Sequence, residues 1–247
     1  MILVTVCTPE YAPGAIALAK SLRANSELKD TGLRALCFNF TSAELWGLES
    51  NGITTLTPQL RYAYVYRDWA AKYRQWTFSS VRIHYQDFFP GVERILHLDS
   101  DCLCLGSLRE LETLKFDGAP WAAVPSLQEP TLGHQTNEAK ESTIGRMPAS
   151  NSGVMLYNMP EWVARHSTER FIDNSPYSRF DHPLNGEGLM NFIDRGVWQP
   201  LPQKFNTSTS AYNPDVDTRI IHAKGARKPW EPNGRGREYW KPYLDAA

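Results

Sequence analysis

The chain has 247 residues, of which 42% are hydrophobic, and a formal net charge of -1. A chain of this length can bury one substantial core, so we expect a single domain. The near-zero charge excludes a general attraction to nucleic acid, and no apolar stretch approaches the roughly 20 residues that cross a bilayer. Four cysteines are too few for a disulfide framework and fit reduced thiols in a cytosol.

Strand and helix signals alternate through the first half of the chain. The β-branched run Ile2–Cys7 predicts a first strand, and residues 15–23 carry apolar side chains at helical spacing. Further strands are predicted at residues 33–38, 53–56 and 92–98, and helices at 42–48 and 69–89. This alternation predicts a layered α/β sheet, in which ligands bind beyond the carboxyl ends of the strands.

The second half begins with a polar stretch, residues 125–150, that is long enough to be a functional loop. A strand is expected at residues 154–157, helices from Pro160 to His166 and over 188–193, and a last short strand at 219–222.

Two carboxylates follow the strand predicted at residues 92–98. Asp99 and Asp101 stand one residue apart, and hard divalent cations such as Mg²⁺ and Mn²⁺ take one or two carboxylates together with substrate phosphates. The alternative interpretation is a solvated turn in which an aspartate bonds the backbone two residues on.

A second polar cluster lies at the end of the last predicted strand. His222 adds an imidazole, which shifts the metal preference toward Mn²⁺, while Gly225 and Lys228 suit an approaching phosphate. The other five histidines lack such neighbours and are interpreted as structural or solvated: His84, His97, His134, His166 and His182.

Several segments in the same order resemble glycosyltransferase family 8, which includes glycogenin and bacterial lipopolysaccharide galactosyltransferases. The matching segments are residues 4–8 with Tyr11, Arg82, residues 96–101 with the D-x-D pattern, residues 151–154, and residues 222–230 with the pattern H-x-x-G-x-x-K-P-W. The resemblance spans residues 2–232, and its last motif is the most specific.

The resemblance implies a GT-A fold, an α/β nucleotide-diphospho-sugar transferase with a Rossmann-like mixed sheet flanked by helices. It implies one domain over residues 1–247, with a nucleotide-binding half at 1–105, an acceptor and catalytic half at 106–232, and a basic aromatic C-terminal segment at 233–247.

The activity that the resemblance implies is that of a retaining, metal-dependent glycosyltransferase. It would move a hexosyl or other sugar from a UDP-sugar to a hydroxyl of a glycan, lipid-linked glycan or protein, with Mn²⁺ or alternatively Mg²⁺. The implied metal ligands are Asp99, Asp101 and His222; the implied donor contacts are Thr8, Tyr11, Arg82, Asp99, Ser100, Gly225 and Lys228; the implied catalytic residues are Asn151, Asn185 and Glu187.

The chain departs from the family pattern at two places. Before the helix at 188–193, Gly186 stands for the usual aspartate and Glu187 for the usual glutamine. A glutamate there would stabilise an oxocarbenium-like centre or act as nucleophile, or it would only favour the helix dipole. Residues 122–126 lack the aspartate that holds donor hydroxyls in many relatives.

Two other functions stay open. One is a non-catalytic domain that binds a nucleotide-sugar or glycan. The other is a sugar-nucleotide pyrophosphorylase, which would need a Gly-rich basic loop after its first strand; residues 8–11 are not such a loop. An aromatic segment at 62–78 is either an acceptor surface or core. We expect a cytoplasmic protein that contacts the inner face of a membrane through basic residues near its C-terminus. Asn206-Thr207-Ser208 matches a glycosylation sequon, which has meaning only in a secreted protein.

Overall fold

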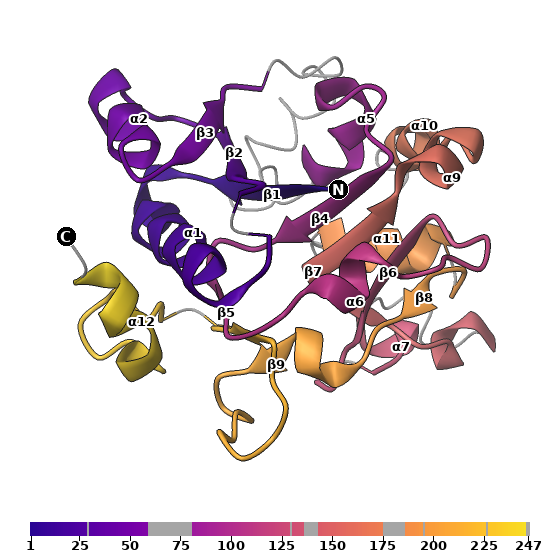
Figure 1. Ribbon diagram of the computed structural model, residues 1–247. Helices are drawn as coiled ribbons and strands as arrows, with labels where there is room; N and C mark the ends of the chain where they lie inside the picture. Colours follow the sequence, from indigo (N-terminus) through magenta and orange to yellow (C-terminus); the bar gives the residue numbers. More distant parts are fainter. Residues whose placement is uncertain are drawn as a thin grey trace. The chain divides into compact units, whose positions relative to one another are not determined.

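A computed structural model, shown in Figure 1, describes residues 1–28, 30–58, 81–128, 130–135, 143–174, 186–194, 196–225 and 227–245. The chain forms two compact units, each made of several segments. Unit 1 comprises Met1–Pro58, Leu96–Lys115 and Pro202–Ala247, and unit 2 comprises Gln59–Ile95 and Phe116–Leu201.

The main sheet of unit 1 has the strand order β3-β2-β1-β4. Its strands are β1 (Ile2–Cys7), β2 (Leu33–Cys37), β3 (Ile53–Leu56) and β4 (Arg94–Leu98), the last of which enters unit 1 at Leu96. β1 pairs with β2 in parallel, and β2 pairs with β3 in parallel. Because parallel strands are covered on both faces, β1 is almost continuously apolar.

Two helices follow the first two strands of this sheet. α1 (Ala12–Asn25) follows the short 3-10 turn η1 (Pro9–Tyr11), has proline in its first turn, and buries Ala15, Leu18 and Leu22. α2 (Ser42–Glu49) begins with a capping box between Thr41 and Glu44, the device that satisfies the first free amides of a helix.

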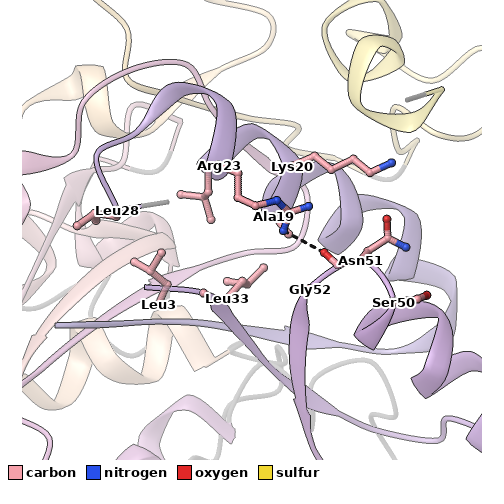
Figure 2. Close-up of a pocket in the computed structure, with 11 residues that line it drawn as sticks. Leu3, Ala19, Lys20, Arg23, Leu28, Leu33, Ser50, Asn51 and Gly52 are labelled. Carbon is pink, nitrogen blue, oxygen red and sulfur yellow. Dashed lines mark hydrogen bonds between the residues drawn. The ribbon is translucent and has the colours of Figure 1, made fainter. Parts of the chain in front are cut away.

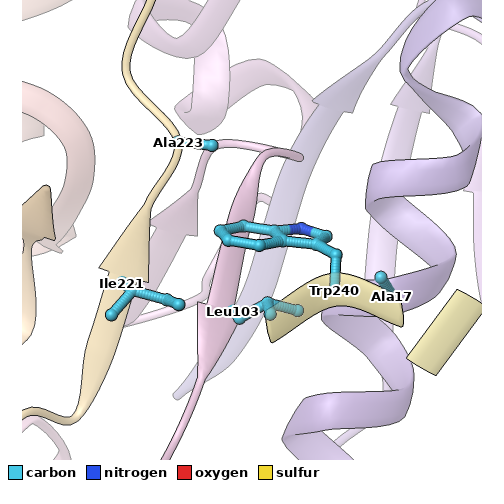
Figure 3. Close-up of a cluster of buried hydrophobic side chains, with 5 residues drawn as sticks. All are labelled: Ala17, Leu103, Ile221, Ala223 and Trp240. Carbon is cyan, nitrogen blue, oxygen red and sulfur yellow. The ribbon is translucent and has the colours of Figure 1, made fainter. Parts of the chain in front are cut away.

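A second, smaller sheet of unit 1 has the order β5-β10-β9. β10 (Ile220–His222) runs antiparallel to β5 (Cys102–Cys104) and parallel to β9 (Thr207–Ser208). The last helix, α12 (Arg237–Leu244), places the fully buried Trp240 against Ala17, Leu103, Ile221 and Ala223 (Figure 3). Trp240 is therefore a core residue, and the C-terminal segment does not present it as part of an aromatic surface. The remaining elements of unit 1 are α6 (Arg109–Glu112) and η4 (Gln203–Phe205).

Unit 2 is built on β7 (Ser150–Asn158), which pairs antiparallel with β6 (Trp121–Pro125). β8 (Gln199–Pro200) runs parallel to β6. An aromatic core forms where Trp162 meets Tyr157 edge-on and stacks on Phe171, with ring centroids 5.2 and 5.6 Å away. Its other elements are η2 (Val81–His84), α5 (Tyr85–Phe88), α7 (Leu132–Gln135), η3 (Thr143–Arg146), α9 (Met159–Ala164), α10 (Ser167–Asn174) and α11 (Gly186–Asp194).

Most of the predicted elements are confirmed within one or two residues at each end. α1 begins three residues before the start predicted at 15, and β7 begins four residues before the start predicted at 154. Of the long helix predicted at residues 69–89, residues 69–80 lie outside the described residues, and the described part is a 3-10 turn followed by the one-turn helix α5. The stretch 125–150 contains α7 and η3. All four cysteines are buried and free. Within the described part of the chain, no helix is long and apolar enough to cross a membrane.

Candidate active site

The Asp99-Ser100-Asp101 turn of unit 1 joins β4 to β5. The Cys102 amide donates to the Asp99 carbonyl at 2.9 Å, which closes a tight turn. The side chain of Asp101 is 6% exposed and that of Asp99 is 30% exposed. The aspartates therefore lie at the carboxyl end of a buried strand, as the sequence predicts, but Asp101 is not the solvated residue of an ordinary turn.

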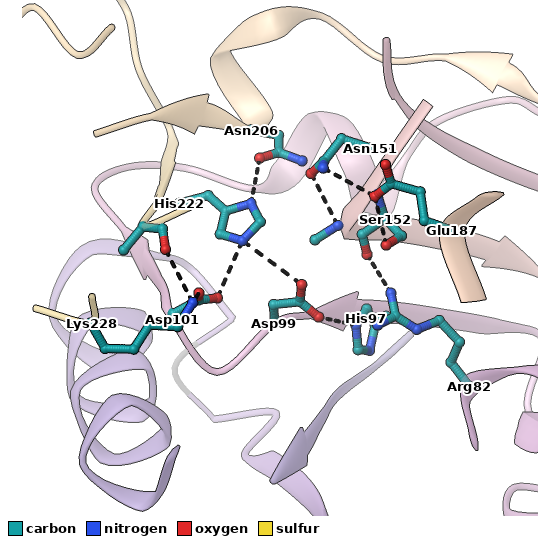
Figure 4. A network of polar contacts seen from close by, with 12 residues as sticks. Arg82, His97, Asp99, Asp101, Asn151, Ser152, Glu187, Asn206, His222 and Lys228 are labelled. Carbon is teal, nitrogen blue, oxygen red and sulfur yellow. Dashed lines mark hydrogen bonds and ion pairs between the residues drawn. The ribbon is translucent and has the colours of Figure 1, made fainter. Parts of the chain in front are cut away.

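The antiparallel pairing of β5 with β10 brings His222 to this turn. His222 lies opposite Cys102 in the register, and the Ala223 amide donates to the Asp101 carbonyl at 3.0 Å. His222 Nε2 then lies 3.2 Å from Asp101 Oδ1 and 3.8 Å from Asp99 Oδ2 (Figure 4). Residues more than a hundred positions apart thus direct one nitrogen and two carboxylate oxygens toward each other.

The donor atoms of this cluster fit a divalent cation. Two carboxylates and one imidazole suit Mn²⁺, while Mg²⁺ prefers oxygen ligands alone. Among the described residues, Asp101, Cys102 and His222 have ligand-type atoms that all lie within 4.8 Å of one another. Burial raises the pKa of Cys102 well above its ordinary value, so it stays a thiol and is a poor ligand for a hard cation.

Lys228 supplies the positive charge of the cluster. Its ammonium lies 2.6 Å from Asp101 Oδ2. Burial alone would raise the pKa of Asp101, but the nearby His222 and Lys228 hold it below its ordinary value. Burial alone would likewise lower the pKa of Lys228, and the Asp101 carboxylate raises it instead. Both side chains are therefore charged at neutral pH.

Two residues that the sequence did not single out complete the cluster. His97 in β4 is fully buried, and its Nε2 lies 2.9 Å from Asp99 Oδ1. Asn206 is also fully buried, and its Oδ1 lies 3.0 Å from His222 Nδ1. Of the two roles expected for His97, structural or solvated, its full burial and its contact with a predicted metal ligand support the structural one. Its place in β4, two residues before Asp99, was the available signal.

The predicted nucleotide loop packs on the same turn. Thr8 is buried and precedes η1, and Tyr11 meets Trp230 edge-on with ring centroids 5.8 Å apart. The Lys228 ammonium lies 5.5 Å from the centre of the Tyr11 ring. Tyr11 is thus a partly buried aromatic side chain beside the charged cluster, where a planar base has an aromatic face to stack on.

Gly14, in the first turn of α1, explains how close this helix comes to the Asp99-Ser100-Asp101 turn. A Cβ atom on Gly14 would lie 2.4 Å from both the Ser100 carbonyl oxygen and the Trp230 ring, so no larger residue fits there. Ser100 itself is buried. Gly225, by contrast, is exposed with φ of +111°, and a Cβ there would meet nothing within 4 Å. Its backbone is open to an approaching anion, as the sequence predicts.

A second polar cluster lies wholly within unit 2. Glu187 Oε2 accepts hydrogen bonds from Asn151 Nδ2 at 3.1 Å, the Ser152 amide at 2.7 Å and the Ser152 hydroxyl at 2.9 Å (Figure 4). Arg82, 3% exposed, donates to the Ser152 carbonyl at 2.6 Å. The structure therefore brings Arg82, Asn151 and Glu187 together around Ser152.

An irregularity of β7 aims these groups. The pairing of β6 with β7 skips from Ala123 opposite Met155 to Val124 opposite Asn151, so the residues between them bulge out of the ladder. Bulges re-aim side chains and recur next to active sites. Glu187, in the first turn of α11, is tied to this bulge, so its carboxylate does more than complement the helix dipole.

Asn185 and the aromatic segment 62–78 lie outside the described residues. A cavity of about 440 Å³ in unit 1 is not a candidate site (Figure 2). It lies where β1 and β2 begin, beside Leu3 and Leu33. Its polar lining includes Arg23, which donates to the Asn51 carbonyl just after α2. Open α/β sheets bind ligands at the other ends of their strands.

Comparison with known proteins adds a family and a fold. The model of the family described as glycosyl transferase family 8 matches residues 2–234. A lipopolysaccharide 1,2-glucosyltransferase of Escherichia coli is 30% identical over 175 residues, which cover 61% of this chain and 50% of that protein. A lipopolysaccharide 1,3-galactosyltransferase of Salmonella typhimurium is 28% identical over 176 residues, covering 65% and 52%. The chain thus spans about half the length of these curated relatives.

Solved structures give the same fold. The galactosyltransferase LgtC in complex with donor and acceptor sugar analogues matches with a TM-score of 0.80 at 18% identity, over 99% of this chain and 95% of that chain. The apo form of the glycosyltransferase GlyE of Streptococcus pneumoniae matches with 0.71 at 17% identity, over 100% and 60%. The predicted α/β fold of the GT-A type is confirmed.

Proposed function

The chain belongs to glycosyl transferase family 8, and from this premise we propose that it transfers a sugar from a UDP-sugar to a hydroxyl group of a saccharide acceptor. The observation that carries the proposal is the convergence of Asp99 and Asp101 on His222, with Lys228 bound to Asp101. A merely glycan-binding module needs no such concentration of charge, whereas the departure of a diphosphate does.

Each residue of this cluster has a role in the proposed reaction. Asp99, Asp101 and His222 would hold Mn²⁺, with Mg²⁺ as the alternative, and a cation there supplies Lewis-acid stabilisation of the charge that develops on the departing UDP. Lys228 is a preorganised positive charge for the diphosphate, and the open backbone at Gly225 admits it. Thr8 and Tyr11 line the base, and Ser100 contacts the donor through the turn.

The cluster of unit 2 is proposed to act on the sugar. Glu187 and Asn151 stabilise the anomeric centre while the acceptor hydroxyl attacks on the side that UDP leaves, which retains the configuration, and Arg82 helps to hold the donor. Asn185 is proposed as a further contact of the sugar. Glu187 has its orientation fixed by Asn151 and Ser152, a requirement for electrostatic stabilisation without reorganisation.

The test is a screen of UDP-sugars for Mn²⁺-dependent hydrolysis or transfer with the wild type, Asp101→Ala and His222→Ala. Asp215→Ala, at an exposed aspartate of the same unit, is the matched control. We expect turnover in the wild type and control, and a loss of at least about 10²-fold in the two site variants. Full activity in both site variants would refute the metal assignment. Metal-dependent UDP binding without turnover in the wild type would favour a non-catalytic binding domain.

The relatives suggest the class of acceptor and the location. The two curated relatives act on lipopolysaccharide by name, and we propose a saccharide or lipid-linked glycan acceptor for this chain. We also propose a cytoplasmic location, which the four free thiols support, with peripheral contact through the exposed Arg235, Arg237 and Lys241. Neutralising these three residues should weaken binding to anionic liposomes; equal binding would remove the membrane contact.

A further inference from the structure

Asn206 makes a buried contact with the side of the His222 ring that faces away from the aspartates. Asn206 Oδ1 lies 3.0 Å from His222 Nδ1, Asn206 is fully buried and His222 is 5% exposed. A carboxamide oxygen only accepts hydrogen bonds, so Nδ1 of the imidazole must carry a proton. In a neutral imidazole the lone pair is then on Nε2.

The consequence falls on the other ring nitrogen. Nε2 lies 3.2 Å from Asp101 Oδ1 and 3.8 Å from Asp99 Oδ2. With the proton on Nδ1, a neutral His222 directs the lone pair of Nε2 toward Asp101 Oδ1 and Asp99 Oδ2, an arrangement that suits a shared cation. When no cation is bound, a second proton on Nε2 lets the ring donate to Asp101 instead. With the proton on Nε2 instead, His222 would donate to Asp101 and could not bind a metal through that nitrogen.

The local fold holds Asn206 in position. Asn206 ends the 3-10 turn η4, where its amide donates to the Gln203 carbonyl at 3.0 Å and its own carbonyl accepts from Gln203 Nε2 at 3.0 Å. The next two residues form β9, which pairs with β10 so that Ser208 lies opposite His222. The backbone of Asn206 is therefore held by hydrogen bonds on both its amide and its carbonyl, which positions its side chain against His222. Because Asn206 is fully buried, it is not a glycan acceptor in the folded protein.

We propose that Asn206 is a positioning residue that selects the Nδ1–H tautomer of His222 and so presents Nε2 to the divalent cation. The proposal rests on the proposed function only in taking His222 as a metal ligand. Outer partners of this kind commonly raise metal affinity by about 10- to 100-fold.

The first measurement is the tautomer of His222, read from ¹⁵N–¹H correlation spectra of the metal-free full chain at a pH at which the imidazole is neutral. The chain has six histidines, and the spectrum of His222→Gln assigns the signal. We expect the Nδ1–H form in the wild type and a mixture with the Nε2–H form in Asn206→Leu. Asn206→Asp keeps an acceptor at the same place and should restore the Nδ1–H form.

The second measurement is Mn²⁺ affinity, followed by electron paramagnetic resonance without any nucleotide. Asn206→Leu should bind Mn²⁺ about 10- to 100-fold more weakly, and Asn206→Asp at least as tightly as the wild type. The control is Asn25→Leu, the same change at a residue of unit 1 that donates to the Cys104 carbonyl and the Tyr243 hydroxyl. It should alter neither the tautomer nor the affinity.

The outcomes separate this proposal from the proposed function. An unchanged Nδ1–H tautomer and unchanged Mn²⁺ affinity in Asn206→Leu would overturn the role of Asn206. A tautomer that shifts in Asn206→Leu and returns in Asn206→Asp supports that role even if the wild type turns over no UDP-sugar, a result that would count against the proposed function alone.

Discussion

Asp101 in unit 1 and Glu187 in unit 2 are both partly or wholly buried carboxylates, but they are held by different partners. Asp101 lies against the Lys228 ammonium and the His222 imidazole. The hydrogen bonds to Glu187 Oε2 come from an amide side chain, a backbone amide and a hydroxyl. The charged partner of Asp101 makes the first site responsive to a cation or a phosphate, while the three donors on Glu187 Oε2 fix that oxygen in one orientation.

A third carboxylate, Asp194, shows how burial shifts a pKa when the partners offset it less. Asp194 in unit 2 accepts from the Trp121 indole at 2.6 Å and lies 3.3 Å from Arg170, and burial raises its pKa above the ordinary value in spite of both partners. The pKa of Asp101 moves the other way because two strong partners outweigh burial. The opposite directions of these two shifts reflect how far the partners of each carboxylate offset its burial.

The largest effect is expected from Asp101→Asn. It should lower kcat/KM by about 10²- to 10³-fold, because it removes a proposed metal ligand. It should also lower the free energy of unfolding by roughly 3 kcal/mol, because Lys228, whose side chain is 12% exposed, loses its carboxylate counter-charge and keeps only weaker contacts such as the Ala223 carbonyl at 3.4 Å. Urea denaturation and UDP-sugar turnover measure the two effects.

The double variant Asp101→Asn with Lys228→Met separates stability from function. Without a buried unpaired charge, it should recover most of the stability and none of the activity. If Asp101→Asn is as stable as the wild type, the Asp101–Lys228 ion pair does not stabilise the fold, and the contrast between Asp101 and Glu187 disappears.

A smaller effect is expected from Glu187→Gln. The amide keeps the shape but loses the negative charge, so we expect about a tenfold lower kcat with little change in KM. The side-chain amide of the variant has an NH₂ group in place of one carboxylate oxygen, and this group cannot accept the hydrogen bond from the Ser152 amide. We therefore expect the free energy of unfolding to fall by roughly 1 kcal/mol. The control is Glu93→Gln, at an exposed residue of unit 2. An unchanged kcat would leave Glu187 a structural role only.

The strongest sequence signals located the charged cluster correctly. Asp99 and Asp101 follow one apolar strand and His222 ends another, and polar residues that follow apolar strands are where α/β proteins bind ligands. Such features depend on local composition, which the sequence shows directly. The pairing of β5 with β10 brings the two strand ends together. The resemblance to a known family then supplied the partnership between segments that lie far apart.

The contacts that sequence analysis missed depend on very short elements. Asn206 lies between the three-residue turn η4 and the two-residue strand β9, and it contacts His222 because β9 pairs with β10. Elements this short have no hydrophobic periodicity from which they could be predicted. The sequence shows Trp240 only as one residue of the basic aromatic segment 233–247, and nothing in that composition predicts its burial. α12 buries it, since one side of a short amphipathic helix can be apolar while its exposed side carries Arg237 and Lys241.

The smallest effect is expected for the pH dependence of stability in unit 2. Because the folded pKa of Asp194 lies above that of the unfolded chain, the folded protein binds its proton more tightly. The stability contribution is therefore greatest at acid pH and is lost as the pH rises from the unfolded pKa, about 3.9, through the folded pKa. Asp194→Asn should remove this slope from a plot of urea midpoint against pH, whereas Asp173→Asn, at an exposed residue of α10, should retain it. Equal slopes in wild type and Asp194→Asn would show that Trp121 and Arg170 fully compensate the buried charge, and the two units would then stabilise their carboxylates in the same way.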